Sequence, residues 1–234
     1  MRTESVPGLR DAVLSNRGIQ HGFGQRGSEV PIDTLFARQV HGSGVWKVMD
    51  VPEGKVRADP PEADVVVVGE PQWSAGIVTA DCVPILAARA DGVAVAAIHA
   101  GWRGLAAGVI EAGIATLRGL AAGRPLVAAI GPAARGCCYE VDEPVRTALC
   151  ERYARWLDGA ILRPGRPGHY LLDLPALAEQ ILLAGGIEPA SLGTQQRVCT
   201  ICDPKRFESF RRDGSKAGRA RHFITVGSRD AGEG

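Results

Sequence analysis

The sequence predicts an α/β or α+β domain, and three observations lead to this fold class. Apolar runs of strand length occur throughout the chain and are interspersed with segments of helical periodicity. Several consecutive strand-like runs are joined by links too short for a helical crossover, which argues against a purely parallel sheet. The 234 residues suit one large domain or two small ones, and no Pro/Gly-rich segment is long enough to be an interdomain linker.

Six apolar runs are predicted to be β-strands because each is bounded by turn-forming residues and is shorter than a typical helix. They lie at 65–68, 76–79, 93–98, 126–130, 170–172 and 223–226. The run at 93–98 is apolar throughout, which is typical of a buried strand. Clusters of Pro and Gly predict loops at 52–61, 164–168 and 185–193.

Three segments are predicted to be helices, at 105–120, 142–157 and 174–184. The first has apolar residues close to helical spacing. The other two begin with an aspartate that can cap the first turn, Asp142 and Asp173, followed by a proline at an early helical position, Pro144 and Pro175. Gly185 stands just past the third segment, where a helix commonly ends.

The composition excludes several classes of protein. Hydrophobic residues make up 45% and charged residues 23%, which is typical of a globular chain and not of a disordered one. The net charge of +1 argues against an extended nucleic-acid surface or a polybasic membrane face. The sequence has no apolar run long enough to span a membrane and no apolar signal segment near its start, so we expect a cytoplasmic protein.

Three segments, 38–42, 78–84 and 98–104, share one design. Each is a strand-like run that ends in a chemically active residue beside small residues, and these residues are His41, Cys82 and His99. Imidazole nitrogen and thiolate sulfur are ligands that Zn²⁺ accepts, and three protein ligands leave a fourth position open for catalysis. The same residues also suit a metal-free Cys–His nucleophile pair.

Seven motifs occur in order along the chain. They are Gln39-Val40-His41-Gly42, Ala80-Asp81-Cys82-Val83-Pro84, His99-Ala100-Gly101-Trp102-Arg103-Gly104, Gly131-Pro132, Cys138-Tyr139-Glu140-Val141, Phe210-Arg211-Arg212-Asp213 and Gly218-Arg219. The set resembles the YfiH family, also called the laccase-domain or polyphenol-oxidase-like family, from His21 to Val226. Its members include the peptidoglycan editing factor of bacteria and the purine-nucleoside-metabolising protein of macrophages.

The resemblance implies one catalytic domain over residues 1–234, with mixed sheets between helices, related to cytotoxic-necrotising-factor-type cysteine hydrolases. It implies a zinc site at His41, Cys82 and His99, with copper as the alternative metal. It also implies phosphorolysis of adenosine, inosine, guanosine or methylthioadenosine, and deamination of adenosine. The family's older laccase label is not supported by the residues, because a multicopper oxidase needs many His ligands in His-X-His pairs and this chain has 5 His and no such pair.

Further site residues are predicted around this set. Asp81 is a candidate catalytic residue that orients a ligand or transfers a proton, with a structural cap as the alternative. Gln39 is a candidate contact to the base or to a ligand. The candidates for binding phosphate or substrate are Arg26, Arg103, Arg211 and Arg212, the last two within a basic segment at 205–222.

Four other cysteines are either metal ligands or structural thiols. Cys199-Thr200-Ile201-Cys202 is a C-x-x-C motif with no second such pair, and Cys137-Cys138 is vicinal. A Cys₄ zinc site would require the two pairs to meet in space. The sequence alone favours structural thiols, because no thioredoxin-like context for redox chemistry is present.

The leading prediction is a zinc-dependent enzyme whose partners are a purine nucleoside and phosphate, acting as a monomer or homodimer without nucleic acid or membrane. Two alternatives stay open. One is an amidase that edits a UDP-MurNAc-linked L-serine at the same site. The other is a non-catalytic module that binds a metal or a partner. The segment between His21 and Gln39 favours this alternative, because it is shorter than the corresponding stretch of the family, which usually includes a helix, and would leave the pocket more open.

Overall fold

The structure, a computed structural model, describes residues 8–49 and 59–227. Its centre is a six-stranded mixed sheet made of β3 (Val45–Val48), β4 (Val65–Val68), β6 (Val83–Arg89), β7 (Val95–Ala100), β8 (Leu126–Ile130) and β12 (Leu192–Gly193). The strand order is β12-β8-β6-β7-β4-β3. The pairs β3–β4 and β8–β12 are parallel and the other pairs are antiparallel.

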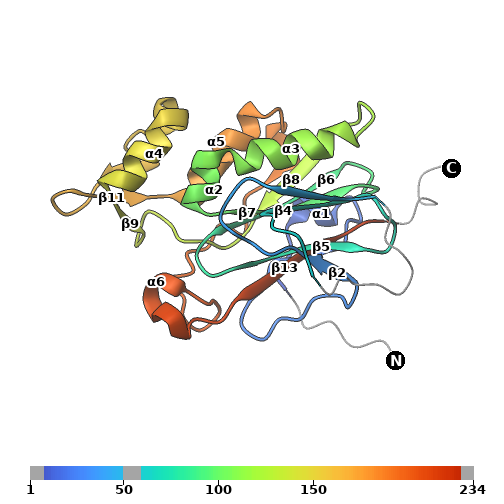
Figure 1. The fold of residues 1–234 in the computed structure, drawn as a ribbon, viewed down its shortest axis with the longest axis horizontal. Helices are drawn as coiled ribbons and strands as arrows, with labels where there is room; N and C mark the ends of the chain where they lie inside the picture. The colour runs from blue at the N-terminus through green and yellow to red at the C-terminus, as the bar shows by residue number, and fades with distance from the viewer. Residues whose placement is uncertain (1–7, 50–58, 228–234) are drawn as a thin grey trace.

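Helices cover one face of this sheet (Figure 1). They are α2 (Trp102–Ala107), α3 (Val109–Gly119) and α5 (Leu174–Ala184). The helix predicted at 105–120 is therefore two helices, because Gly108 adopts φ +83° and ends α2 where α3 begins. The prediction for 174–184 is confirmed, with the Asp173 side chain accepting a hydrogen bond from the amide of Ala176.

A second sheet covers the opposite face. It contains β1 (His21–Gly22), β2 (Thr34–Phe36), β5 (Ser74–Thr79) and β13 (Ala220–Thr225), in the order β1-β13-β5-β2. Strand β4 explains why the central strands are apolar throughout: Val65 and Val67 pack toward the helices, whereas Val66 and Val68 pack toward the second sheet. Both faces of the central sheet are thus buried, as its run of four valines indicates.

A smaller sheet lies at one end of the molecule, on the left of Figure 1. It consists of β9 (Glu140–Asp142), β10 (Leu162–Pro164) and β11 (His169–Leu172), and α4 (Glu143–Tyr153) follows β9 directly. Asp142 caps α4 as predicted, but the helix ends at Tyr153 and continues only as a 3-10 turn, Ala154–Trp156. The remaining helical elements are short: α1 (Ala12–Ser15), α6 (Phe210–Asp213) and the 3-10 turns Pro189–Ser191 and Gly214–Lys216.

The mixed α/β class and all six predicted strands are confirmed. The sequence pattern missed the short strands β1, β2, β3, β9, β10 and β12, the last of which lies within the loop predicted at 185–193. It also missed β6, since Pro84 argues against a strand interior; here it is the second residue of the strand. Most of the loop predicted at 52–61 lies outside the described residues. So do residues 1–7, where the sequence predicts no apolar signal segment. Within the described ranges, no helix has the length and apolar character needed to cross a membrane.

Candidate active site

Strand pairing brings His41, Cys82 and His99 together. His99 lies in β7, where it is paired with Pro84 of β6, so Cys82, the residue before β6, lies beside it. His41 comes from the loop between β2 and β3, and its ring meets the ring of His99 edge-on, with centroids 4.9 Å apart. One ligand atom from each of the three residues lies within 4.8 Å of the other two. The predicted set is therefore assembled in space.

Asp64 positions both histidines. It precedes β4, is 0% exposed, and its Oδ1 lies 2.7 Å from Nδ1 of His99. The same carboxylate accepts hydrogen bonds from the amides of Val40, His41 and Gly42. These bonds hold His41 at φ +60°, a left-handed conformation that is uncommon for a residue with a Cβ. Because Nδ1 of His99 is bound by Asp64, Nε2 is the nitrogen available to a ligand.

The electrostatics of the site favour a thiolate. Burial raises the pKa of Cys82, but hydrogen bonds with His41 and His99 outweigh burial and bring the pKa to about 6. Burial lowers the pKa of His99, but hydrogen bonds with Asp64 and Cys82 raise it to about 9. Burial raises the pKa of Asp64, but hydrogen bonds from His99 and from the amides of Gly42 and Val40, together with the charge of His99, outweigh burial and lower it. The thiolate is the form of cysteine that binds metals and acts as a nucleophile.

Gly101 leaves room for two of these three side chains. A Cβ at this position would lie 2.8 Å from Sγ of Cys82 and 3.3 Å from Cδ2 of His41. Real Cβ atoms do not approach sulfur this closely, so a larger residue would displace the side chains of Cys82 and His41. The backbone passes between them only because this position has no side chain.

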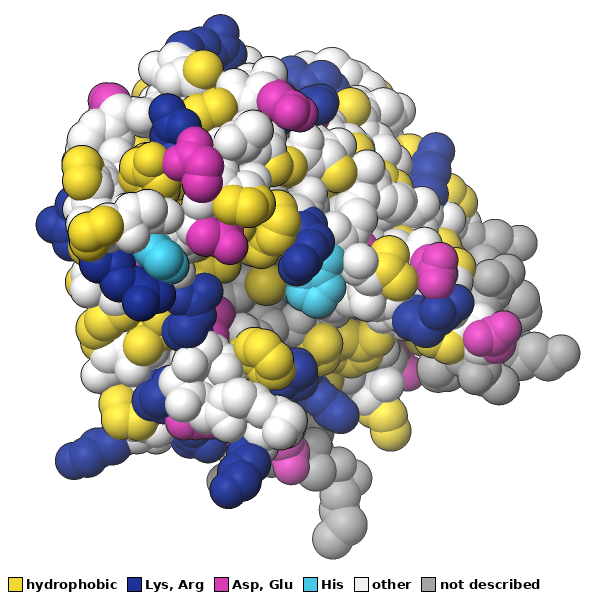
Figure 2. All heavy atoms as spheres, turned by 60° about the vertical axis from the view of Figure 1, so that its left-hand side comes forward, with side chains coloured by type: hydrophobic (Ala, Val, Ile, Leu, Met, Phe, Trp, Pro, Cys, Tyr) yellow, Lys and Arg dark blue, Asp and Glu magenta, His cyan; other side chains and the backbone are white. Residues whose placement is uncertain are grey.

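The three residues lie in the wall of a cavity of about 570 Å³, a size typical of small-molecule sites. Three aromatic side chains, Trp102, Tyr139 and Phe210, also line it, and Phe210 is 53% exposed. Figure 2 shows a hollow on the face of the molecule that carries α4 and α6, with Lys and Arg side chains around it and hydrophobic side chains inside it. The cavity thus combines apolar surface with positive charge.

Arg103, Arg211 and Arg219 line this cavity. Among the described residues, none of the three forms an ion pair with a carboxylate. Arg103 lies over the ring of Trp102, 4.3 Å from its centroid, and Arg211 lies over Tyr139 at 4.6 Å. Their positive charges are therefore available to an anionic ligand.

Asp81 and Gln39 line the cavity as predicted, but their polar atoms bind the chain itself. The Asp81 carboxylate accepts hydrogen bonds from the hydroxyls of Thr200 and Ser209 and from the amide of Arg211. The Gln39 amide group exchanges two hydrogen bonds with the backbone of Val78. Both arrangements are those of residues that position the cavity wall.

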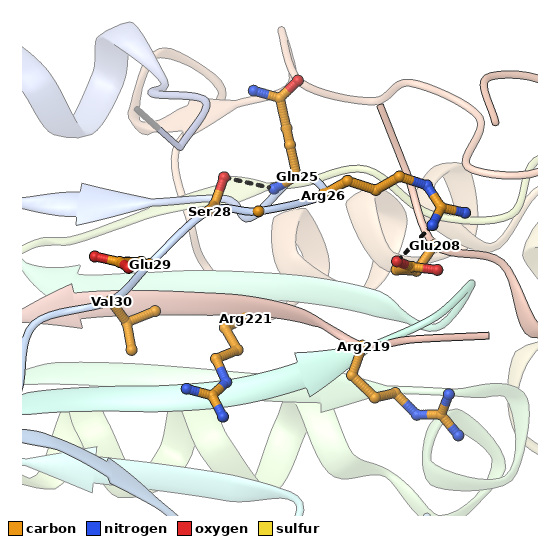
Figure 3. Close-up of a pocket in the computed structure, with 9 residues that line it drawn as sticks. Gln25, Arg26, Ser28, Glu29, Val30, Glu208, Arg219 and Arg221 are labelled. Atoms are coloured by element: carbon orange, nitrogen blue, oxygen red, sulfur yellow. Dashed lines mark hydrogen bonds and ion pairs between the residues drawn. The ribbon is translucent and has the colours of Figure 1, made fainter. Parts of the chain in front are cut away.

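The structure does not bring the predicted Arg26 and Arg212 into this cavity. Arg26 lies in a separate pocket and points toward Glu208, with which it forms an ion pair of 2.7 Å (Figure 3). Arg212 pairs with Asp213 and donates hydrogen bonds to the carbonyls of Thr200 and Ile201. Both guanidinium groups hold the segment around α6 in place.

Sequence reasoning missed Asp64, Tyr139 and Arg219 as site residues. Tyr139 and Arg219 stand inside the recognised motifs, so the motifs themselves could have indicated them. Asp64 directly precedes the predicted strand at 65–68. Its signal appears only once that strand is paired with β7, because Val65 lies opposite Ile98.

A family model described as multi-copper polyphenol oxidoreductase laccase matches residues 10–227. The chain belongs to this laccase-domain family, the YfiH family. Among curated proteins, a purine nucleoside phosphorylase of Xylella fastidiosa is 40% identical over 192 residues, which is 82% of this chain and 72% of the relative. Purine nucleoside phosphorylase YfiH of Escherichia coli is 34% identical over 197 residues, 83% of this chain and 74% of the relative.

Solved structures of the YfiH family have the same fold. Bacillus licheniformis hypothetical protein YfiH aligns with a TM-score of 0.73 at 28% identity, covering 83% of this chain and 74% of that one. YlmD from Geobacillus stearothermophilus aligns with a TM-score of 0.73 at 31% identity, covering 84% and 74%. The resemblance predicted from the seven motifs is confirmed.

The donor set of this YfiH-family site fits one zinc ion better than a copper cluster. One sulfur and two imidazole nitrogens suit tetrahedral Zn²⁺ with an open fourth position. The chain's five histidines all lie in the described residues, and three of them are engaged elsewhere. His21, His169 and His222 have both ring nitrogens bonded to other groups of the chain.

Proposed function

We propose that this YfiH-family protein is a purine nucleoside phosphorylase that works with a zinc ion held by His41, Cys82 and His99. The observation that carries the proposal is the cavity, which combines this donor set with guanidinium groups that form no ion pair with any carboxylate in the described part of the chain. The names of the curated relatives from Xylella fastidiosa and Escherichia coli support the same activity.

The cavity suits the two substrates of phosphorolysis. Phosphate carries about two negative charges near neutral pH, and Arg103 and Arg211 provide donors with fixed geometry for its oxygens. The half-exposed ring of Phe210 offers an apolar face to a purine base. In the reaction, a phosphate oxygen forms a bond to C1′ of the ribose while the bond from C1′ to N9 breaks. The bonding electrons move to the purine, which takes up a proton as it leaves.

The chain's own residues supply orientation and proton donors. Asp64 fixes the tautomer and direction of the His99 ring, so the ligand nitrogen keeps its position during turnover. Burial and the charge of Cys82 raise the pKa of Tyr139 to about 12, so its phenol stays protonated and can donate a hydrogen bond within the cavity. When bound, zinc supplies Lewis acidity that polarises an oxygen or nitrogen of the substrate.

The proposal extends to adenosine, inosine, guanosine and methylthioadenosine as substrates, and to deamination of adenosine as a second activity. Deamination adds water to C6 of the purine and releases ammonia, and zinc enzymes of other folds perform this chemistry with Cys and His ligands. A shared centre accounts for both activities because each needs an electrophile beside the base.

The test is an assay of the zinc-loaded protein on adenosine and inosine, with and without phosphate. We expect release of adenine and hypoxanthine that depends on phosphate, and release of ammonia from adenosine that does not. Cys82→Ala should abolish both. Cys150→Ser is the matched control, because Cys150 lies on α4 outside the candidate site, and it should keep full activity.

A second variant tests the phosphate site. Arg103→Ala should raise KM for phosphate about 10- to 100-fold, as expected for loss of a charge-assisted hydrogen bond of about 1.5–3 kcal/mol. Lys47→Ala, which removes an exposed cation from β3, should leave KM unchanged. Full activity in Cys82→Ala would overturn the proposal. Cleavage of UDP-MurNAc-L-serine with no action on nucleosides would instead establish the amidase alternative.

A further inference from the structure

Four cysteines from two distant segments meet at the surface of the protein. Cys137 and Cys138 lie between β8 and β9, whereas Cys199 and Cys202 lie between β12 and α6. The four sulfur atoms all lie within 4.8 Å of one another, and all four thiols are free. Sγ of Cys202 is 3.6 Å from that of Cys137 and 2.9 Å from that of Cys138. We call this group the four-cysteine cluster.

We propose that the four-cysteine cluster is a second, structural zinc site, separate from the centre at His41, Cys82 and His99. A tetrahedron with zinc–sulfur distances of about 2.3 Å has sulfur–sulfur edges of about 3.8 Å. The sulfur–sulfur distances of the cluster, 2.9 Å, 3.6 Å and none above 4.8 Å, lie on either side of this value. A disulfide would need two sulfurs about 2.05 Å apart and would leave the other two unpaired. Four thiolates fill the coordination shell, so this site has no open position for catalysis.

The surroundings of the cluster support metal binding. Cys199 is buried, and burial raises the pKa of its thiol, but hydrogen bonding from the backbone of Cys202 and Arg135 helps to bring the pKa below its usual value. Such bonds orient a ligand sulfur and share its negative charge. Cys137 and Cys202 are exposed, so an ion can reach the cluster from solvent. The C-x-x-C turn thus provides one anchored sulfur and one accessible sulfur.

The proposed zinc joins two segments that support the active-site cavity. The segment before the vicinal pair is bound to the second segment through Ala133, whose amide donates to Val198 and whose carbonyl accepts from Thr200. The hydroxyl of Thr200, which lies between the two cysteines of the C-x-x-C motif, donates to the carboxylate of Asp81. A metal that fixes this turn therefore also fixes the position of Asp81, the residue next to Cys82.

The test measures bound zinc per chain in the purified full-length protein, with variants that separate the two sites. We expect two zinc ions per chain in the wild type and one in Cys202→Ser. We also expect one in Cys82→Ala and two in Cys150→Ser, the matched control. Substitution with cobalt(II) provides a second readout. The charge-transfer absorption of a four-thiolate site should persist in Cys82→Ala and disappear in Cys202→Ser, with circular dichroism confirming that each variant is folded.

Each alternative result contradicts the proposal. If the wild type holds one zinc ion, and a thiol reagent titrates all four cysteines of the cluster in the folded protein, the cluster is a set of free thiols. If peptide mapping finds Cys138 joined to Cys202 under metal-replete conditions, the cluster is a disulfide site. Neither result bears on the phosphorylase proposal, because the Cys82→Ala variant reports on that centre independently.

Discussion

Protonation of His222 should set the acid limit of the protein's stability. His222 lies in β13 and is 1% exposed; its Nδ1 accepts a hydrogen bond from the amide of Gly24, and its Nε2 is 2.9 Å from the hydroxyl of Thr79. Burial, with a smaller contribution from the charge of His99, lowers its pKa to about 3. The ring is therefore neutral in the folded protein under ordinary conditions, with its proton on Nε2.

The sign of the effect follows from linkage. Between about pH 3 and pH 6.5 the unfolded chain binds a proton at His222 and the folded chain does not, so stability falls as the pH falls. Integrated from pH 7 to pH 5, with a native pKa of about 3, this one group removes about 2 kcal/mol from the free energy of unfolding. His21, whose pKa burial also lowers, acts in the same direction.

The assay compares urea unfolding at pH 7 and pH 5 for the wild type and His222→Asn, in which the amide oxygen can still accept from Gly24. Acid-driven loss of metal affects both proteins and cancels in the difference. We expect the wild type to lose about 2 kcal/mol more than the variant between the two pH values. The reasoning is refuted if both lose the same free energy, or if NMR shows His222 protonated in the folded protein at pH 5.

Three further outcomes are expected. Asp64→Asn should weaken zinc binding at the candidate active site about 10- to 100-fold, measured by competition with a chelator, because His99 loses its fixed orientation. In the metal-free protein, alkylation of Cys82 by iodoacetamide should rise with a midpoint near pH 6, followed by mass spectrometry of its peptide; a midpoint near pH 9 would contradict the bonding described. Gly131→Ala should cost about 1–3 kcal/mol in thermal unfolding, because its Cβ would lie 2.2 Å from the ring of Phe23. In Gly119→Ala the new Cβ would meet no atom of the described residues within 4 Å, so this variant should not be destabilised.

The candidate metal-binding set could be predicted from the sequence because its chemistry is local. His41, Cys82 and His99 each end a strand-like run, and their residue types alone restrict the metals that could bind. The strands could be predicted equally well, since a run such as 65–68 shows its apolar character in its own four residues, whichever elements pack against it. Metal chemistry and strand composition are both properties of short segments.

What could not be predicted depends on pairing between distant segments. Asp64 is an ordinary aspartate before a strand until β4 pairs with β7 and places it against His99. Arg26 was a reasonable anion-binding candidate, but a loop brings Glu208 to it and its charge is neutralised there. The two cysteine pairs met the stated condition for a Cys₄ site only once the fold placed them together. Each case turns on a contact that local patterns do not encode.

The position of β13 has a consequence for how the protein is made. This strand, near the end of the described chain, lies between β1 and β5 and pairs with both. About 140 residues separate β5 from β13, so at roughly 5–20 residues per second a ribosome needs on the order of ten seconds to supply the missing partner. During that interval one edge of β5 has unsatisfied backbone groups beside apolar side chains, the kind of surface that aggregates. The nascent chain is therefore expected to depend on chaperones until β13 emerges.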